Sequence, residues 1–181
     1  MTDLQYEAHD KWEWVGRIET LSGLKVSIFE PEHDMFNLED IATSLSHICR
    51  YNGHVPHFYS VAEHCVKVAH WIEKHTFDYD IILTGLLHDA AEAYVGDMVR
   101  PLKRHEEYGR KHQATENAIA KKIHEKFGGH FPYIDIIHEA DKQVYIWEVE
   151  HIRTGRTIGL QPKEAKQLWL DAYAHYSLGK K

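Results

Sequence analysis

The sequence contains no long hydrophobic run and only two cysteines. Its longest apolar stretches, such as DIILTGLLH and YIDIIHEA, are much shorter than the roughly 20 residues that a membrane-spanning helix needs. The opening segment MTDLQYEAHD lacks the basic-then-apolar order of a signal peptide. Cys49 and Cys65 stand in apolar helical patterns without paired spacing, which favours reduced thiols. We therefore expect a cytoplasmic protein with no membrane partner.

The sequence also lacks a block of basic residues. Its 21 lysines and arginines stand against 28 acidic residues and give a formal net charge of -7. Proteins that grip a nucleic-acid duplex normally carry a basic patch, so we do not expect polymeric nucleic acid as a partner. A small anionic ligand would need a local cation or a metal ion to offset the negative charge.

Signs of several domains and of extended sheets are absent as well. The 181 residues contain no repeat, linker or low-complexity tract, and 43% of them are hydrophobic, which is enough for one core. Only residues 17–29 alternate apolar and polar side chains, on either side of Ser22-Gly23, which predicts a β-hairpin within about residues 15–30. We predict a single all-α domain over residues 1–181, with this short N-terminal hairpin.

Helical periodicity and capping residues are found along the remainder of the chain. Asn37 is a plausible N-cap, and Ser60 with Glu63 has the spacing of a capping box. Asp80 can cap the next predicted helix, and Gly96 can end it. Because this helix is apolar on nearly all sides up to Leu87, we expect the helix to be the buried central element. The expected helices span about residues 38–48, 61–75, 81–95, 106–127, 133–152 and 162–176.

Histidine is abundant, with sixteen residues, and one group stands out in the segment HDAAE. His88, Asp89 and Glu92 lie at positions i, i+1 and i+4 of a predicted helix, so they converge near one face. Burying carboxylates costs several kcal/mol unless they are compensated, and no lysine or arginine lies within this helix. A metal ion would compensate them. The alternative is that His88 caps the helix and both acids face water.

Two further residues extend this group into an ordered pattern. His64 falls in the first turn of one predicted helix, and the His88-Asp89 pair ends the next one. Asp141 lies on or beside the inward-facing stripe of a much later helix. The order H…HD…D favours a metal site over a chance dipeptide match.

These residues and their surroundings resemble the HD-domain metal-dependent phosphohydrolases. The matching text is CRYNGH, FYSVAEH, LLHDAAEAYVGDMVRPLK and EADK, and the resemblance covers most of the chain. It is closest to a small branch that contains bacterial 5'-deoxynucleotidases and phage-encoded deoxynucleoside triphosphate triphosphohydrolases. The resemblance implies an HD-domain helical bundle and a homo-oligomer, in the host cytoplasm if the protein is phage-encoded. It also implies one divalent metal ion held by His64, His88, Asp89 and Asp141.

Two imidazoles and two carboxylates would favour zinc, cobalt, manganese or iron over magnesium, which prefers oxygen ligands. Glu92 is placed to orient or deprotonate an attacking water, and Asp97 lies beyond the helix end, where it could protonate a leaving oxygen. The family assigns both residues catalytic duties of this kind. The alternatives are a solvent-facing helix position for Glu92 and a turn-forming role for Asp97.

Basic residues near the matching text are candidates for binding phosphate. Arg50 is the preferred clamp because the planar guanidinium suits a phosphate group, and Lys103 and Arg100 are further candidates. Arg104 and Arg110 add to the positive charge after Asp97. Surface salt bridges are the alternative for each of these side chains.

Aromatic residues are candidates for the walls of a nucleoside pocket. Tyr51, Phe58 and Trp147 could stack on a base, although aromatic residues at helical spacing are more often core residues. His54 and His57 could face the same pocket or lie on a surface loop. Near the N-terminus, Trp12 and Trp14 could pack against the domain or against a neighbouring subunit.

The leading functional hypothesis is a deoxynucleoside triphosphate triphosphohydrolase, with dATP as one candidate substrate. A metal-activated water would attack the α-phosphorus and release the nucleoside and triphosphate. The first alternative is a 5'-deoxynucleotidase that acts on monophosphates. The alternative from another class is a non-catalytic, metal-stabilised nucleotide-sensing module, although Glu92 and Asp97 would then be superfluous.

Overall fold

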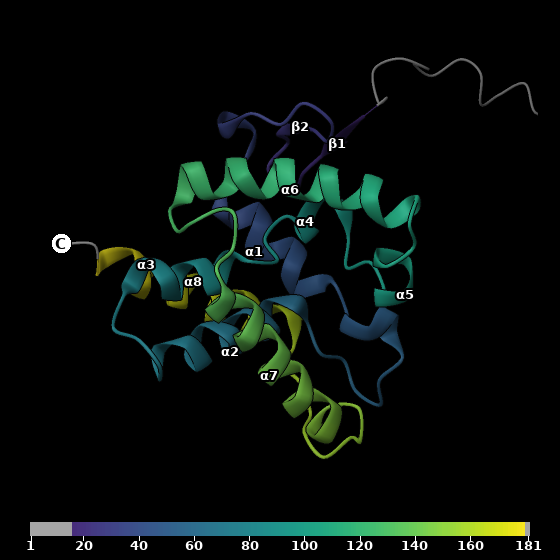
Figure 1. Ribbon diagram of the computed structural model, residues 1–181, viewed down its shortest axis with the longest axis vertical. Coiled ribbons are helices and arrows are strands. Elements are labelled where there is room, and N and C mark those ends of the chain that lie inside the picture. Colours follow the sequence, from purple (N-terminus) through teal and green to yellow (C-terminus); the bar gives the residue numbers. More distant parts are fainter. Residues whose placement is uncertain (1–15, 180–181) are drawn as a thin grey trace, which may run out of the picture.

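The computed structural model describes residues 16–179, so Trp12 and Trp14 lie outside the described residues. The fold is mostly helical, with one short antiparallel hairpin at its N-terminal end (Figure 1). The elements are β1 (Arg17–Glu19), β2 (Lys25–Ser27), the 3-10 turn η2 (His33–Met35), α1 (Leu38–His47), the 3-10 turn η3 (Arg50–Gly53), α2 (Val61–Glu73), α3 (Tyr79–Leu87), α4 (Glu92–Val95), α5 (Arg100–Lys103), α6 (Tyr108–Phe127), α7 (Asp135–His151) and α8 (Pro162–Leu178).

The predicted hairpin is confirmed and is tied to the helical body. Ile18 pairs with Val26 across the two strands, and Gly23 takes the positive φ of 84° that the turn requires. The hydroxyl of Ser22 donates to the Asp40 carboxylate at 2.6 Å, which links the turn to α1. The side chain of Val26 is fully buried, so the hairpin contributes to the core.

Helix α2 lies at the centre of the helical packing and contacts α1, α3, α7 and α8. Its N-cap is confirmed, because the Ser60 hydroxyl accepts a hydrogen bond from the backbone N–H of Glu63 at 3.1 Å. The predicted second half of the capping box is wrong. The Glu63 carboxylate accepts instead from the backbone N–H of Leu160 at 2.8 Å, which joins α2 to the segment before α8.

The predicted continuous helix over residues 81–95 is wrong in two respects. It begins at Tyr79 and is capped by Asp78 rather than Asp80, since Asp78 accepts from the backbone N–H of Asp80 at 2.9 Å. It also ends at Leu87. The next four residues form a turn with shorter-range bonds, such as Glu92 N–H to the Asp89 carbonyl at 2.9 Å, before α4 begins.

The helix ends at Leu87 because a side chain takes over a backbone acceptor. A continuing helix would pair the Gly85 carbonyl with the backbone N–H of Asp89. In the structure the Gly85 carbonyl accepts from His88 Nδ1 at 2.7 Å instead. His88 and Asp89 therefore lie in the turn between α3 and α4.

The remaining helices form as predicted, with small shifts at their ends. In Figure 1, α6 runs across the upper part of the view between the hairpin and the other helices, and it contacts α3 and α5. The short helix α5 is not predicted from the sequence. The core is built around buried side chains of α1, α2, α3, α7 and α8, the largest of which are Trp169 and Tyr176. Among residues 16–179, no helix is both long enough and apolar enough to span a bilayer.

Candidate metal centre and adjoining pocket

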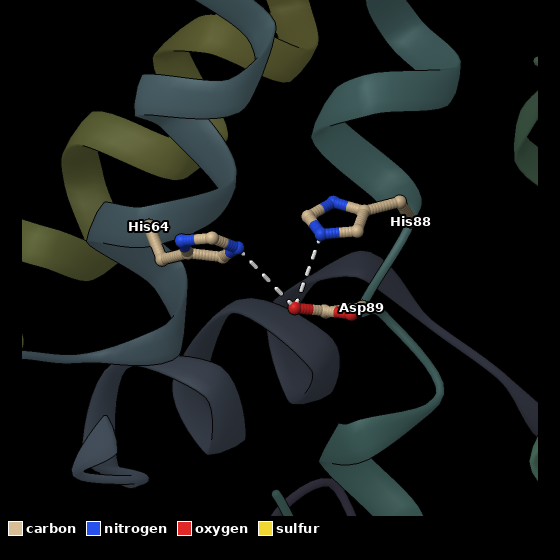
Figure 2. A group of neighbouring side chains, drawn as sticks. All are labelled: His64, His88 and Asp89. Atoms are coloured by element: carbon tan, nitrogen blue, oxygen red, sulfur yellow. Dashed lines mark ion pairs between the residues drawn. The ribbon is translucent and has the colours of Figure 1, made fainter. Parts of the chain in front are cut away.

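His64 from α2 meets His88 and Asp89 from the turn after α3 (Figure 2). Both imidazole rings direct Nε2 toward the same carboxylate oxygen of Asp89, at 3.5 Å from His64 and 3.1 Å from His88. One nitrogen or oxygen atom from each of the three residues lies within 4.8 Å of the others. Helix α2 and the turn after α3 thus bring two imidazoles and one carboxylate close together.

The other nitrogen of each ring is already occupied. His64 Nδ1 lies 2.7 Å from Glu148 Oε1, and His88 Nδ1 lies 2.7 Å from the Gly85 carbonyl oxygen. In the neutral form of each imidazole the single N–H must lie on Nδ1, where both acceptors require it, so Nε2 would present a lone pair. Both Nε2 atoms are buried and make no hydrogen bond among residues 16–179. Such unsatisfied, convergent lone pairs fit a metal ion.

Asp141 approaches this group from α7. Its Oδ1 lies 3.3 Å from His64 Nε2, and its side chain is 39% exposed. The tightest group comprises the other three predicted ligands, and Asp141 adjoins it on the side that opens to solvent. The structure therefore brings all four predicted ligand residues together, with Asp141 beside the closest three.

The neighbouring carboxyl groups of Asp89 and Glu92 have pKa values shifted in opposite directions. Burial raises the pKa of Asp89, but the neighbouring His88 and His64 outweigh it and hold the pKa well below its ordinary value. Burial and the nearby Asp89 charge raise the pKa of Glu92 well above its ordinary value. The two carboxylates therefore differ in character. Asp89 favours the ionised form, whereas Glu92 is suited to exchanging a proton.

Glu92 is 2% exposed, so the solvent-facing alternative for this residue is wrong. Its Oε1 accepts a hydrogen bond from Lys103 Nζ at 2.8 Å, and its buried Oε2 has no hydrogen-bond partner within the described residues. Lys103 Nζ also pairs with Glu116 Oε1 at 3.1 Å. Lys103, predicted to bind phosphate, is therefore already held between two carboxylates.

Asp97 follows the turn at Gly96, whose φ is 79°, and lines the same cavity as Asp89. Burial raises the pKa of Asp97, although the Arg50 charge opposes the effect. A carboxyl group with a raised pKa can carry a proton in the range where an ordinary aspartate is ionised. Asp97 is therefore both a turn residue and a cavity residue.

A cavity of about 470 Å³ adjoins the candidate metal centre. Acidic, basic and aromatic side chains all line it. The lining residues are Arg50, Tyr51, His54, Asp89, Glu92, Asp97, Met98, Val99, Arg100, Pro101, Lys103, Asp141, Tyr145 and Arg153. The volume is in the range of small-ligand sites.

Arg50 and Tyr51 line this cavity and share one buried partner. Arg50 donates from Nε and Nη2 to Glu148 Oε2 at 3.1 and 3.0 Å, and the Tyr51 hydroxyl donates to the same oxygen at 2.7 Å. Arg50 Nη1 also lies 3.9 Å from Asp89 Oδ2. Burial opposes ionisation of Glu148, but His64 and Arg50 lower its pKa to about 2.

Two arginines at the cavity carry no ion pair among residues 16–179. The Arg100 guanidinium lies 4.6 Å from the centre of the Tyr145 ring, and that of Arg153 lies 5.6 Å from the centre of the Tyr51 ring. The two tyrosine rings are 6.4 Å apart. Arg100 was a predicted phosphate contact, whereas Arg153 and Tyr145 were not predicted.

Of the two loop histidines, His54 lines the cavity and His57 does not. Phe58, Arg104 and Arg110 also lie outside the lining among the described residues. So does Trp147, whose indole ring stacks on His151 at 4.7 Å.

Glu148 is the site residue that the sequence reasoning missed most clearly. It follows Asp141 by seven positions on α7, which places both on one helix face two turns apart. That spacing is a signal that could have identified it. Glu116 of α6 gives no comparable signal, because its role depends on contact with Lys103 from another element.

No family model matches the chain. Over 112 residues, the chain is 39% identical to the uncharacterized protein YfdR of Escherichia coli (strain K12), covering 61% of this chain and 58% of YfdR. It is 31% identical to an uncharacterized protein of Rhodobacter capsulatus over 112 residues, covering 60% of this chain and 56% of that protein. The chain thus spans less than two thirds of the length of these relatives. Neither name states an activity.

Proposed function

We propose that the protein is a divalent-metal-dependent phosphohydrolase of the HD-domain type that cleaves the 5' phosphoester bond of deoxynucleotides. The observation that carries the proposal is the convergence of two buried histidine Nε2 atoms, which make no hydrogen bond among residues 16–179, on Asp89, which lines a cavity together with several basic side chains. Supporting features are the buried Glu92 and the cavity-lining Asp97.

His64, His88, Asp89 and Asp141 would hold the ion. Their mixed nitrogen and oxygen set favours zinc, cobalt or manganese over magnesium. When bound, such an ion would lower the pKa of a water molecule and polarise a phosphoryl oxygen.

Glu92 and Asp97 would carry the two proton transfers. Glu92 has a free, buried Oε2 and would accept a proton from the water that attacks the α-phosphorus. Lys103 holds the other oxygen and so fixes the orientation of the carboxylate. The bond between the α-phosphorus and the 5' oxygen breaks, and Asp97 would give its proton to that oxygen. The products are the nucleoside and the phosphate chain that was attached to it.

The basic residues favour a triphosphate as substrate. Arg50 lies next to Asp89 and would contact the α-phosphate. Arg100 and Arg153 face the cavity without a carboxylate partner among the described residues, so they are available for the β- and γ-phosphates. We therefore infer a deoxynucleoside triphosphate triphosphohydrolase, with dATP as one candidate substrate. A 5'-deoxynucleotidase acting on monophosphates is the second candidate, because it would use the same proposed metal ligands together with Glu92 and Asp97.

A non-catalytic, metal-stabilised nucleotide-sensing module remains the alternative from another class. The buried position and raised pKa of Glu92 favour catalysis, because a structural site has no use for an extra carboxyl group held there. As a further part of the proposal, the protein would act as a homo-oligomer.

The test is incubation of the purified protein with a panel of nucleoside mono-, di- and triphosphates, before and after chelation and metal restoration. Chromatography should detect free nucleoside and intact triphosphate, only when metal is present. Asp89→Asn should abolish turnover, whereas Asp171→Asn, at an exposed position on α8, should not change it. Nucleoside and phosphate from monophosphates alone would select the second candidate. No turnover with any metal would refute an enzymatic function.

A further inference from the structure

Glu148 is a fully buried carboxylate that connects the candidate metal centre to the wall of the cavity. Burying a charged carboxylate is costly unless donors surround it. Four donor groups from two other elements do so: His64 Nδ1 from α2, and Arg50 Nε, Arg50 Nη2 and the Tyr51 hydroxyl from η3. Such a concentration of donors on one buried side chain goes beyond what packing of α7 requires.

The two oxygens of Glu148 serve different parts of the site. Among residues 16–179, the hydrogen bond to Oε1 comes from His64, at 2.7 Å, and this bond keeps the imidazole proton on Nδ1. Oε2 accepts from Arg50 and from Tyr51, both of which line the cavity. Oε1 therefore sets the tautomer of the proposed metal ligand His64. Oε2 sets the position of the two cavity-lining side chains, Arg50 and Tyr51.

The backbone of η3 indicates why such an anchor is needed. Tyr51 and Asn52 both have left-handed conformations, with φ of 58° and 53°, although neither is glycine. This region is strained for residues other than glycine, and they persist in it where surrounding contacts hold them. The hydroxyl bond to Glu148 is such a contact for Tyr51, and it holds the ring over the cavity.

We propose that Glu148 is a positioning residue that couples the metal centre to substrate binding. The part of this proposal that concerns the substrate rests on the proposed function. It keeps His64 in the form that offers the Nε2 lone pair, and it holds Arg50 and Tyr51 at the cavity. It touches neither the metal nor the substrate.

The variant Glu148→Gln separates the two halves of this role. An amide has one oxygen and one NH₂ group, so it can satisfy only one side. The three donors of Arg50 and Tyr51 should capture the oxygen, which leaves the NH₂ group facing His64 Nδ1. His64 would then need its proton on Nε2, the nitrogen that the metal requires. We expect a 10- to 100-fold loss of Zn²⁺ affinity, measured by competition with a chromogenic chelator.

Tyr51→Phe tests the substrate half. It removes one Oε2 donor and leaves the bond from His64 to Oε1 intact. We expect Zn²⁺ affinity to stay within twofold of the wild type, while KM for the nucleotide turned over fastest rises several-fold at saturating Zn²⁺. A rise in KM together with an equal loss of Zn²⁺ affinity would contradict the division between the two oxygens.

Glu63→Gln is the matched control. Glu63 is also buried, at 5% exposure, and precedes His64 in α2, but its Oε2 accepts from the backbone N–H of Leu160. An amide oxygen can accept that bond equally well. Zn²⁺ affinity and KM should therefore match the wild type. If Glu148→Gln also matched the wild type in both values, the coupling role would be wrong.

A direct measurement covers the case in which Glu148→Gln does not fold. Nitrogen-15 NMR of the Zn²⁺-loaded wild type should place the His64 proton on Nδ1, and an unprotonated Nδ1 would overturn the proposal. The metal measurements are independent of catalysis. If the wild type turned over no nucleotide, the proposed function would fail, while Zn²⁺ competition would still decide whether Glu148 supports the metal centre.

Discussion

The buried histidine His124 should make the protein less stable in mild acid. Its side chain lies in α6 at 4% exposure, with Nδ1 3.0 Å from the Gly128 carbonyl oxygen. The rings of Phe131 and Tyr133 lie beside it, and in the part of the chain that the structure describes its buried Nε2 has no hydrogen-bond partner. Burial lowers the pKa of His124 to about 4. The imidazole is therefore neutral in the folded protein at pH values where an exposed histidine is charged.

The sign and size of the effect follow from proton uptake on unfolding. The ordinary histidine pKa is 6.5, so the unfolded chain binds a proton between pH 6.5 and about 4 that the folded protein does not bind. The contribution to stability is therefore complete above about pH 6.5 and is lost as the pH falls toward 4. At roughly 1.4 kcal/mol per pH unit, the loss amounts to about 3 kcal/mol.

Urea unfolding between pH 7 and pH 4 measures this loss. The variant His124→Gln cannot bind the proton, so its free energy of unfolding should fall by about 3 kcal/mol less than that of the wild type over this range. His75→Gln, at an exposed position after α2, should follow the wild type. Parallel pH profiles for the wild type and His124→Gln would refute the reasoning.

Three further changes test other parts of the structure. Gly109→Ala would place a methyl group against the backbone carbonyl of Lys103. The free energy of unfolding of this variant, measured by urea titration, should therefore be lower by ~1–3 kcal/mol than that of the wild type. Unchanged stability would contradict this close packing. Arg153→Ala should raise KM several-fold for deoxynucleoside triphosphates but not for monophosphates, and an equal rise for both would contradict its assignment to the phosphate tail. His88→Ala should lose the metal in elemental analysis of the dialysed protein, unlike the control His70→Ala, and full retention would argue against the site.

Local signals account for the parts of the fold that the sequence predicts correctly. Asn37 and Ser60 cap their helices as expected, since each cap depends on a backbone N–H only three residues away. The hairpin around Gly23 likewise depends on neighbouring residues. Hydrophobic periodicity located the remaining long helices, with differences of a few residues at their ends.

Contacts between distant segments account for what the sequence did not reveal. The Glu63 carboxylate binds the backbone N–H of Leu160, 97 residues away, so its part in the predicted capping box failed. The interruption after Leu87 depends on the direction in which His88 turns its ring. The donors around Glu148 come from segments 84 to 98 residues earlier in the chain. Spacing within one helix does not encode such partners.

The four residues predicted as ligands have a distinctive order along the chain, and the structure brings them together. The sequence could not show that Lys103 is already paired with carboxylates, because Glu116 lies on a helix whose packing angle the sequence does not specify. The sequence thus predicts which ligand candidates and acidic residues come together at and beside the cavity. It does not predict which of the surrounding cations are already neutralised and which are available to a ligand.

Hydrolysis in ¹⁸O-labelled water tests the central claim most directly. The metal-restored protein is incubated with a deoxynucleoside triphosphate, and both products are analysed by mass spectrometry. Attack of water on the α-phosphorus predicts that one labelled oxygen enters the released triphosphate and none enters the nucleoside. Label in the 5' hydroxyl of the nucleoside, or no turnover of any nucleotide with any divalent metal, would contradict the account.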